Sequence, residues 1–356
     1  MKKYLSPALA VSCLLTFAQV SFAQPKPAAT DQPYKVVKSE KVGGDGAFDY
    51  VLADSTERRL YFARGDRVMV HDLDTLKLVK EISGCKGARG VAVDPKSHHG
   101  FSSSSPVVMW DSKTLETIKT IPVEGKPDAM FFDPTTEHIF VFSHEAPNAT
   151  VLDSKDGSIL GTIDLGGAPE QAVSDGQGHV YVNLEDKAQV AVIDAKALKV
   201  TAHYDFSDKG KVATGLALDV KNHILFACCR NPAICVILNA DDGKVITTLP
   251  IGAHCDGAVF NPATQETFTS QRDGTLTVIK QTKPGTFEVV QTVQTKAGAK
   301  TCALDSKTNQ IFLITADRLP PPPTPAAAVP GEAAPRPARG ANFVPGTFTI
   351  LVVGSE

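Results

Sequence analysis

The sequence predicts an all-β fold, a seven-bladed β-propeller, because one short pattern recurs seven times along the chain. Each copy is an apolar run that ends in Asp or Asn and is followed by a turn. The seven end points lie 39 to 44 residues apart, at Asp54, Asp94, Asp133, Asp175, Asp219, Asn261 and Asp305. A repeat of roughly 40–50 residues made of short apolar runs is typical of a propeller, in which each unit forms one four-stranded blade.

A second pattern runs in phase with the first and indicates a third strand in most repeats. Runs such as VHD and VLD end at Asp72, Asp111, Asp153, Asp194 and Asn239. The runs are rich in Val, Ile and Phe and are separated by Gly, Pro, Asn and Asp, which disfavours helical repeats of this length. In the third repeat the pattern predicts strands at residues 129–132, 139–142, 149–152 and 158–163.

The N-terminal residues 1–23 have the features of a secretory signal peptide. Lys2 and Lys3 precede an apolar stretch, and small residues flank a cleavage position after Ala23. The stretch is too short and too interrupted to span a membrane. We therefore expect an exported protein, periplasmic or secreted, with a disordered leader rich in Pro and Ala at residues 24–33.

The charge balance argues against a surface built for nucleic acid. The whole chain has 36 basic and 39 acidic residues. Loss of Lys2 and Lys3 with the signal peptide leaves 34 basic residues and a net charge of −5. A mildly acidic protein of this kind does not have the overall basic footprint of nucleic-acid binding.

Residues 34–356 are expected to form a single domain, closed by its own N-terminal strand, and to act as a monomer. The seventh repeat supplies only three strands. Residues 35–42 alternate suitably for the missing fourth strand, which would join the first and last blades and remove the open sheet edges. A Pro-rich insertion at residues 319–345 interrupts the seventh repeat and lacks the apolar content of a core. We expect this insertion to be a mobile cover, either a passive solvated loop or a gate for a ligand or partner.

Six cysteines remain after cleavage of the signal peptide, and two interpretations of them stay open. They are Cys85, Cys228, Cys229, Cys235, Cys255 and Cys302. Export permits disulfides, and Cys228 or Cys229 is placed to face Cys235 across a hairpin turn. Free cysteine is equally at home as a small buried apolar residue. No CxxC motif indicates metal binding or redox catalysis.

The repeats resemble those of the bacterial YVTN-repeat propellers, the YncE-like group. The resemblance rests on units such as VVMWDSKTLETIKTIPVEG at residues 107–125, PDAMFFDP at 127–134 and IFV at 139–141, and it covers nearly all of the mature chain. The chain departs from the family in Phe-rich variants of the tetrad and in a degenerate sixth repeat, QETFT at 265–269. The resemblance implies seven blades and exported or surface ligand binding, and it supplies no catalytic motif.

A ring of charged residues is predicted at the mouth of the axial channel. The position five residues before each repeat marker is charged in six of seven repeats: Asp49, Arg89, Asp128, Glu170, Thr214, Asp256 and Lys300. The residues that follow are apolar or small. One interpretation is a binding site for a hydrophilic ligand or a cation. The other is that the four acids and two bases pair with each other and cap turn amides in a wet channel.

The loops between the second and third strands add further polar residues to the same face. These are Arg64, His144, Glu145, Glu185, Arg230, Arg272 and Asp317. The arginines are suited to a carboxylate or phosphate, although a solvated loop charge is the commoner role. Among the histidines only His144 and His254 map to this face, whereas His98, His99, His138, His179 and His223 fall in turns on the opposite face.

These residues predict a binding protein rather than an enzyme. No zinc-ligand set is apparent and no cofactor is predicted, although Asp49, Asp128, Glu170 and Asp256 offer oxygen ligands for Ca²⁺. We expect a non-enzymatic binding or scaffold propeller that takes a small polar ligand or an envelope protein at the channel mouth. The alternative is a lactonase-like or lyase-like propeller in which acids and a histidine act as acid and base.

Overall fold

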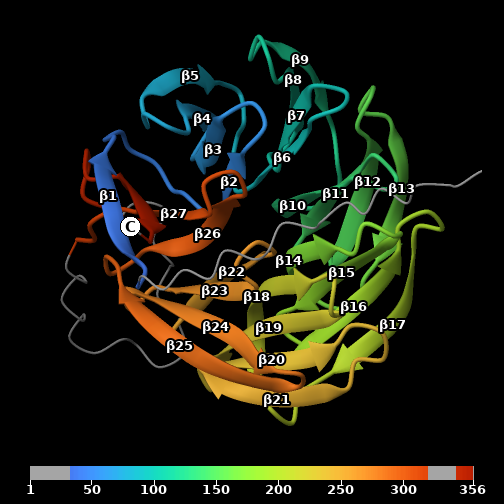
Figure 1. Ribbon diagram of the computed structural model, residues 1–356. Helices are drawn as coiled ribbons and strands as arrows, with labels where there is room; N and C mark the ends of the chain where they lie inside the picture. The colour runs from blue at the N-terminus through green and yellow to red at the C-terminus, as the bar shows by residue number, and fades with distance from the viewer. Residues whose placement is uncertain (1–32, 320–341, 356) are drawn as a thin grey trace, which may run out of the picture.

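The described residues form seven four-stranded antiparallel sheets arranged in a ring (Figure 1). The structure is a computed structural model that describes residues 33–319 and 342–355. This part of the chain contains 28 strands and no helix. The prediction of an all-β, seven-bladed propeller is therefore confirmed.

Blades 1 to 3 take up the first half of the ring. Blade 1 consists of β2 (Val51–Asp54), β3 (Arg59–Arg64), β4 (Arg67–Asp72) and β5 (Leu78–Ile82). Blade 2 consists of β6 (Val91–Asp94), β7 (His99–Ser102), β8 (Val107–Asp111) and β9 (Thr117–Ile121). Blade 3 consists of β10 (Pro127–Asp133), β11 (His138–Ser143), β12 (Asn148–Asp153) and β13 (Ile159–Asp164). The strands predicted for this third repeat differ from the observed ones by at most two residues at either end.

Blades 4 to 6 continue the ring in the same order. Blade 4 consists of β14 (Pro169–Ser174), β15 (His179–Leu184), β16 (Gln189–Asp194) and β17 (Lys199–Asp205). Blade 5 consists of β18 (Lys211–Asp219), β19 (Ile224–Asn231), β20 (Ile234–Asn239) and β21 (Val245–Pro250). Blade 6 consists of β22 (Cys255–Asn261), β23 (Glu266–Gln271), β24 (Thr275–Lys283) and β25 (Thr286–Gln294). The sixth repeat, whose sequence departs from the pattern, thus still folds into a complete blade.

Blade 7 is closed by the N-terminal strand, as the sequence predicts. It combines β26 (Lys300–Asp305), β27 (Gln310–Thr315) and β28 (Thr349–Gly354) with β1 (Lys35–Lys41), which pairs antiparallel with β28. Tyr34 precedes β1 and is only 5% exposed. Its ring packs edge-on against Phe268 of blade 6 at 4.9 Å, and its hydroxyl donates a hydrogen bond of 2.7 Å to Glu266. The closing strand is therefore anchored to two blades.

The recurring Asp or Asn of each repeat lies at or just after the end of the inner strand, where its side chain can stabilise the turn that follows. Asp54 accepts hydrogen bonds from the backbone amides of Thr56 and Glu57, and Asp94 accepts one from Lys96. A short carboxylate side chain can satisfy amides two and three residues ahead, which favours Asp at the start of such turns. The spacing of the markers is therefore the spacing of the blades.

The core lies between the blades rather than inside any one of them. Seven clusters of buried apolar side chains are found in the described residues, and each combines residues of two neighbouring blades. In the cluster of blades 1 and 2, the indole of Trp110 is fully buried and lies over Gly100. A Cβ atom at Gly100 would lie 2.2 Å from the Trp110 ring, so that only glycine fits there. Seven interfaces of this kind hold the inner strands at a common radius.

The six cysteines are free thiols, and all are buried. Cys228 and Cys235 are direct partners across β19 and β20, but they do not form a disulfide. Burial raises the pKa of the Cys229 thiol to about 12. The structure therefore shows the second of the two interpretations, in which the cysteines are small buried residues.

Several predicted segments lie outside the described residues, namely the signal peptide at 1–23, nearly all of the leader at 24–33 and most of the insertion at 319–345. The described ends of the insertion lie side by side, because Arg318 and Phe343 form an antiparallel bridge. The backbone amide of Leu319 also donates a hydrogen bond of 2.8 Å to the carbonyl of Asn342. Among the described residues there is no helix of sufficient length and hydropathy to cross a membrane.

Candidate functional site

A polar pocket of about 330 Å³ lies where the inner strands begin and the second strands end. It is lined by Asp49, Tyr50, Arg89, Lys126, Asp128, His144, Glu145, Glu170, Glu185, Arg230, Asp256 and Arg272. Eight of the eleven residues that the sequence predicts for the channel mouth are in this lining, which blades 1 to 6 all supply. The repeat brings them together, because equivalent positions of successive blades lie at the same height around the axis.

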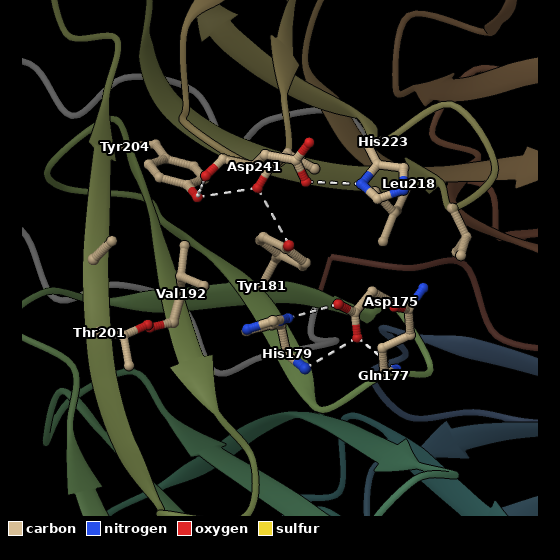
Figure 2. Close-up of a pocket in the computed structure, with 13 residues that line it drawn as sticks. Asp175, Gln177, His179, Tyr181, Val192, Thr201, Tyr204, Leu218, His223 and Asp241 are labelled. Carbon is tan, nitrogen blue, oxygen red and sulfur yellow. Dashed lines mark hydrogen bonds and ion pairs between the residues drawn. The ribbon is translucent and has the colours of Figure 1, made fainter.

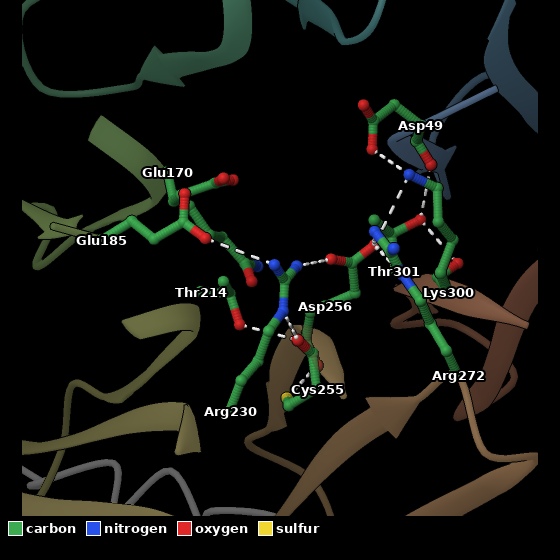
Figure 3. Close-up of polar contacts among 12 residues, drawn as sticks. Asp49, Glu170, Glu185, Thr214, Arg230, Cys255, Asp256, Arg272, Lys300 and Thr301 are labelled. Carbon is green, nitrogen blue, oxygen red and sulfur yellow. Dashed lines mark hydrogen bonds and ion pairs between the residues drawn. The ribbon is translucent and has the colours of Figure 1, made fainter. Parts of the chain in front are cut away.

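One side of the pocket is a network of three cations around Asp256 (Figure 3). Arg230 forms an ion pair with Asp256, and Arg272 pairs with it at 2.7 Å. Lys300 lies 3.4 Å from the same carboxylate and also pairs with Asp49. Burial opposes ionisation of Asp256, but the charges of Lys300 and Arg272 outweigh it and lower its pKa. This side therefore carries more positive than negative charge.

Arg89 and Asp128 form a separate ion pair beside this network. Asp128 is 4% exposed, whereas the Arg89 side chain remains 27% exposed to the pocket. Together with the contacts of Lys300, this pair shows that five of the seven ring positions do pair with each other. The pairing interpretation of the ring thus describes Asp49, Arg89, Asp128, Asp256 and Lys300.

Glu170 differs from the other ring acids, because no arginine or lysine pairs with it in the described part of the chain. The hydroxyl of Tyr50 donates a hydrogen bond of 2.7 Å to its Oε2. Burial, together with the nearby charges of Asp128 and Glu185, raises the pKa of Glu170 to about 8. Burial and the same Glu170 charge raise the pKa of Tyr50 well above its ordinary value.

Glu185 lies beside Glu170 but has a different environment. Its Oε2 is 2.9 Å from Nε2 of His144, and its Oε1 is 3.2 Å from Nη1 of Arg230. The hydrogen bond with His144 and the charge of Arg230 lower the pKa of Glu185. The same hydrogen bond raises the pKa of His144. Two carboxyl groups in one pocket thus have pKa values displaced in opposite directions.

His144, Glu170 and Glu185 are a set of residues that can hold a metal ion. One ligand atom from each lies within 4.8 Å of the other two. The repeat pattern predicts that all three lie on the same face, but it does not predict a metal set, because the distance between the loops of blades 3 and 4 is not encoded in the repeat. The oxygen ligands suggested for Ca²⁺ are not gathered in this way, since Asp49, Asp128 and Asp256 are ion-paired with basic side chains.

Three predicted site residues do not line the pocket. Thr214 is buried, and its hydroxyl donates a hydrogen bond of 2.8 Å to the carbonyl of Cys255. His254 is exposed in the turn before β22 with a φ of 62°. Lys300 is not in the lining either, and it acts through its contacts with Asp49 and Asp256.

Tyr50 and Lys126 also line the pocket, although the repeat pattern does not predict them. The residue that follows the ring position was described as apolar or small, and this is wrong for Tyr50 and Gln171. In the other repeats this residue is Gly, Ala or Thr. A large polar side chain at a position that is small in the other repeats, as at Tyr50, is the sequence feature that could have indicated a role in the pocket.

Gln171 spans the channel below the polar pocket. Its Nε2 donates a hydrogen bond of 2.7 Å to the carbonyl of Ala258, and its Oε1 accepts from the amides of Leu216 and Ala258 at 3.1 and 3.0 Å. Gln171 also lines a mainly apolar hollow of about 660 Å³, with Phe131 and Phe260 in its wall.

A second polar pocket, of about 390 Å³, lies between blades 4 and 5 on the opposite face (Figure 2). His179 pairs with Asp175 and His223 pairs with Asp241, each through Nδ1 at 2.7 Å. Both histidine side chains are about half exposed. They lie in or beside turns between the first and second strands, as the sequence predicts.

The comparisons with known proteins identify distant relatives. No family model matches the chain. The chain is 23% identical over 166 residues to YncE, described as an uncharacterized protein, of Salmonella typhi and of Salmonella typhimurium strain LT2. The match covers 44% of this chain and 47% of each relative, so that it spans about half the length of the curated relatives.

Proposed function

We propose that this chain, a YncE-like seven-bladed β-propeller, is an exported monomeric protein that binds a small polar ligand at the channel mouth. The ligand class that fits best is a small molecule with a carboxylate group. The observation that carries this proposal is a pocket of about 330 Å³ lined almost wholly by charged side chains. Its volume is at the lower end of the about 300–1,000 Å³ of small-molecule sites.

The basic side of the pocket supports an anionic group on the ligand. Arg230 and Arg272 keep 24% and 34% of their side chains exposed, although both pair with Asp256. A guanidinium has five donors in a fixed fork and binds carboxylates in a bidentate manner. Arg230 is also engaged by Glu185 and by the Cys255 carbonyl. Arg272 donates to Asp256 through Nε and Nη2, and its Nη1 makes no hydrogen bond within the described residues, which makes Arg272 the better candidate to bind a ligand carboxylate.

The signal-peptide pattern at residues 1–23 supports export, which brings the pocket into contact with solutes of the cell envelope. A concave pocket of this size also favours a small ligand over a protein partner. Partner surfaces of stable complexes are larger, at about 800 Å² on each side.

Ligand-induced stabilisation tests the proposal. The mature protein is melted by differential scanning fluorimetry with a panel of small carboxylates, amino acids and sugar acids. A ligand present at 100 times its Kd stabilises the native state by about 2.7 kcal/mol, which raises the melting temperature measurably. The Arg272→Gln variant is expected to lose this response, because the exposed guanidinium is removed.

Arg58→Gln is the matched control. Arg58 lies in the turn after β2 on the opposite face, pairs with Asp74 and Asp305, and has a side chain that is 23% exposed. This variant should keep the full ligand response even where its basal stability falls. A panel without any stabilising compound, or an equal loss of response in both variants, contradicts the proposed site.

The second candidate function is acid–base catalysis of the lactonase or lyase type. It is favoured by the two carboxyl groups Glu170 and Glu185, whose surroundings differ although they share one pocket. Glu170 lies against the phenol of Tyr50, and Glu185 lies between an imidazole and a guanidinium. Different surroundings are the usual basis of separate acid and base roles. If the mature wild-type protein turns over lactones and the Glu185→Gln variant does not, this function is favoured over binding alone.

A further inference from the structure

We infer that His144, Glu170 and Glu185 form a binding site for one divalent transition-metal ion, with Zn²⁺ as the best match. The three residues come from neighbouring blades. His144 directly follows β11 of blade 3, Glu185 directly follows β15 of blade 4, and Glu170 is the second residue of β14. Their ligand atoms converge at the acidic side of the polar pocket, which is open to solvent.

The distances fit a single ion. Nε2 of His144 lies 2.9 Å from Oε2 of Glu185 and 4.0 Å from Oε1 of Glu170. Ligand atoms about 2.0–2.2 Å from one Zn²⁺ ion lie roughly 3.0–3.4 Å apart at ordinary angles. The two observed distances bracket this range, so that small rotations of the Glu170 and His144 side chains complete the geometry.

The residues around the three ligands are arranged as supporting groups. The Tyr50 hydroxyl donates to Oε2 of Glu170, and Nη1 of Arg230 contacts Oε1 of Glu185. The opposite oxygens of the two carboxylates face His144. Hydrogen bonds of this kind to the outer oxygen orient a ligating carboxylate, and they are a regular feature of metal sites.

The ligand types select the class of ion. An imidazole nitrogen suits Zn²⁺ and other transition metals, whereas Ca²⁺ and Mg²⁺ prefer oxygen ligands only. Three protein ligands leave at least one position for water or another ligand, and the pocket lies on that side. The site is therefore of the open kind rather than a closed structural one.

This inference deepens the proposed binding function, since the ion and the arginines would contact different groups of one ligand. Arg230 joins the two sides of the pocket, because it contacts Glu185 and Asp256 at once (Figure 3). A ligand carboxylate would lie toward Arg272, and a second polar group would lie toward the ion. The metal site can nevertheless be tested with the ion alone.

The test is a titration of the metal-free mature protein with ZnCl₂, followed by isothermal titration calorimetry and by metal analysis after dialysis. One equivalent of Zn²⁺ per chain is expected, with much weaker binding of Ca²⁺ and Mg²⁺. Co²⁺ should bind at the same site and give visible absorption bands that Zn²⁺ abolishes. Wild-type protein that retains no Zn²⁺, or that binds Ca²⁺ as tightly as Zn²⁺, overturns the inference.

Substitutions locate the ion. The Tyr50→Phe variant should weaken Zn²⁺ binding by about 10–100-fold, as is usual for loss of a supporting hydrogen bond. His144→Ala and Glu185→Gln should weaken it further, since each removes a ligand. The two ligand variants are made separately, and circular dichroism shows which of them is folded, so that one misfolded variant does not decide the result.

The control is the double variant His179→Asn with His223→Asn, which removes the two histidine–aspartate pairs of the opposite face. It should keep the full equivalent of Zn²⁺. Loss of Zn²⁺ in this variant and retention in His144→Ala would place the ion on the opposite face and overturn the inference.

If Zn²⁺ binds as expected but no carboxylate stabilises the protein, the ligand proposal fails and the metal site stands. If carboxylates stabilise the protein through Arg272 but no ion binds, the metal site is wrong and the ligand proposal stands.

Discussion

Substitution of Tyr34 should destabilise the whole propeller, although this residue lies at the edge of the described chain. Tyr34 is 5% exposed and precedes the strand that closes blade 7. Its ring packs on Phe268, and its hydroxyl donates a hydrogen bond to Glu266, both in blade 6. The side chain therefore fastens the N-terminal strand to a blade other than its own.

The magnitude follows from these contacts. Truncation of a buried aromatic side chain to Ala typically costs about 3–5 kcal/mol. Tyr34→Phe keeps the ring and removes only the hydrogen bond to a carboxylate, for which about 1.5–3 kcal/mol is expected. Lys280 contacts Oε1 of Glu266 at 3.2 Å, so that this carboxylate should keep a partner in both variants.

Equilibrium unfolding in urea provides the assay, with the fluorescence of Trp110 and far-ultraviolet circular dichroism as probes. Trp110 is the only tryptophan and is fully buried between blades 1 and 2, in a different interface from that of Tyr34, which lies between blades 6 and 7. If closure stabilises the ring as a unit, both probes should shift together by the same free energy. Glu40→Ala, at an exposed position of β1, is the control and should change the stability by less than about 0.5 kcal/mol.

Two results would refute this reasoning. One is a Tyr34→Ala variant as stable as Glu40→Ala, which would mean that the clasp contributes nothing. The other is a loss of circular dichroism signal at low urea while Trp110 stays buried, which would mean that blade 7 opens locally without affecting the ring.

Three further predictions concern the channel and the core. Lys300→Met should destabilise the protein by about 3–5 kcal/mol in urea unfolding, because it leaves the buried carboxylates of Asp49 and Asp256 without their shared lysine; unchanged stability would contradict the structural role of this pair. Gln171→Ala should cost about 1–3 kcal/mol and speed hydrogen exchange of the Ala258 amide, which loses its acceptor. His71 is buried, its Nδ1 contacts the Leu76 carbonyl at 2.8 Å, and burial lowers its pKa below the ordinary value of about 6.5. Its contribution to stability is therefore present above about pH 6.5 and is lost as the pH falls below it, so that acidification should destabilise wild type more than His71→Asn in parallel urea titrations.

The sequence determined the architecture, because the features that define a blade are local. The aspartates at the ends of the inner strands cap turns only a few residues ahead, as Asp54 does, so that their spacing counts the blades directly. The strand at residues 35–41 was predictable for a related reason, since an incomplete last repeat leaves a sheet edge to be covered. The sequence also predicted most of the residues that reach the channel mouth, because equivalent repeat positions lie at one height around the axis.

Only the tertiary structure decided how these residues meet. Periodicity gives the position of a side chain within its blade, but not the distances between side chains of different blades. Those distances depend on how the seven apolar interfaces set the radius of the ring and on the rotamers of long side chains. Arg230 and Asp256 are ion-paired for this reason, and His144, Glu170 and Glu185 converge although they are 41, 26 and 15 residues apart in the sequence. The pairing within the ring, the position of Glu170 beside Tyr50 and His144, and the candidate metal ligands are therefore properties of the closed ring and not of the repeat.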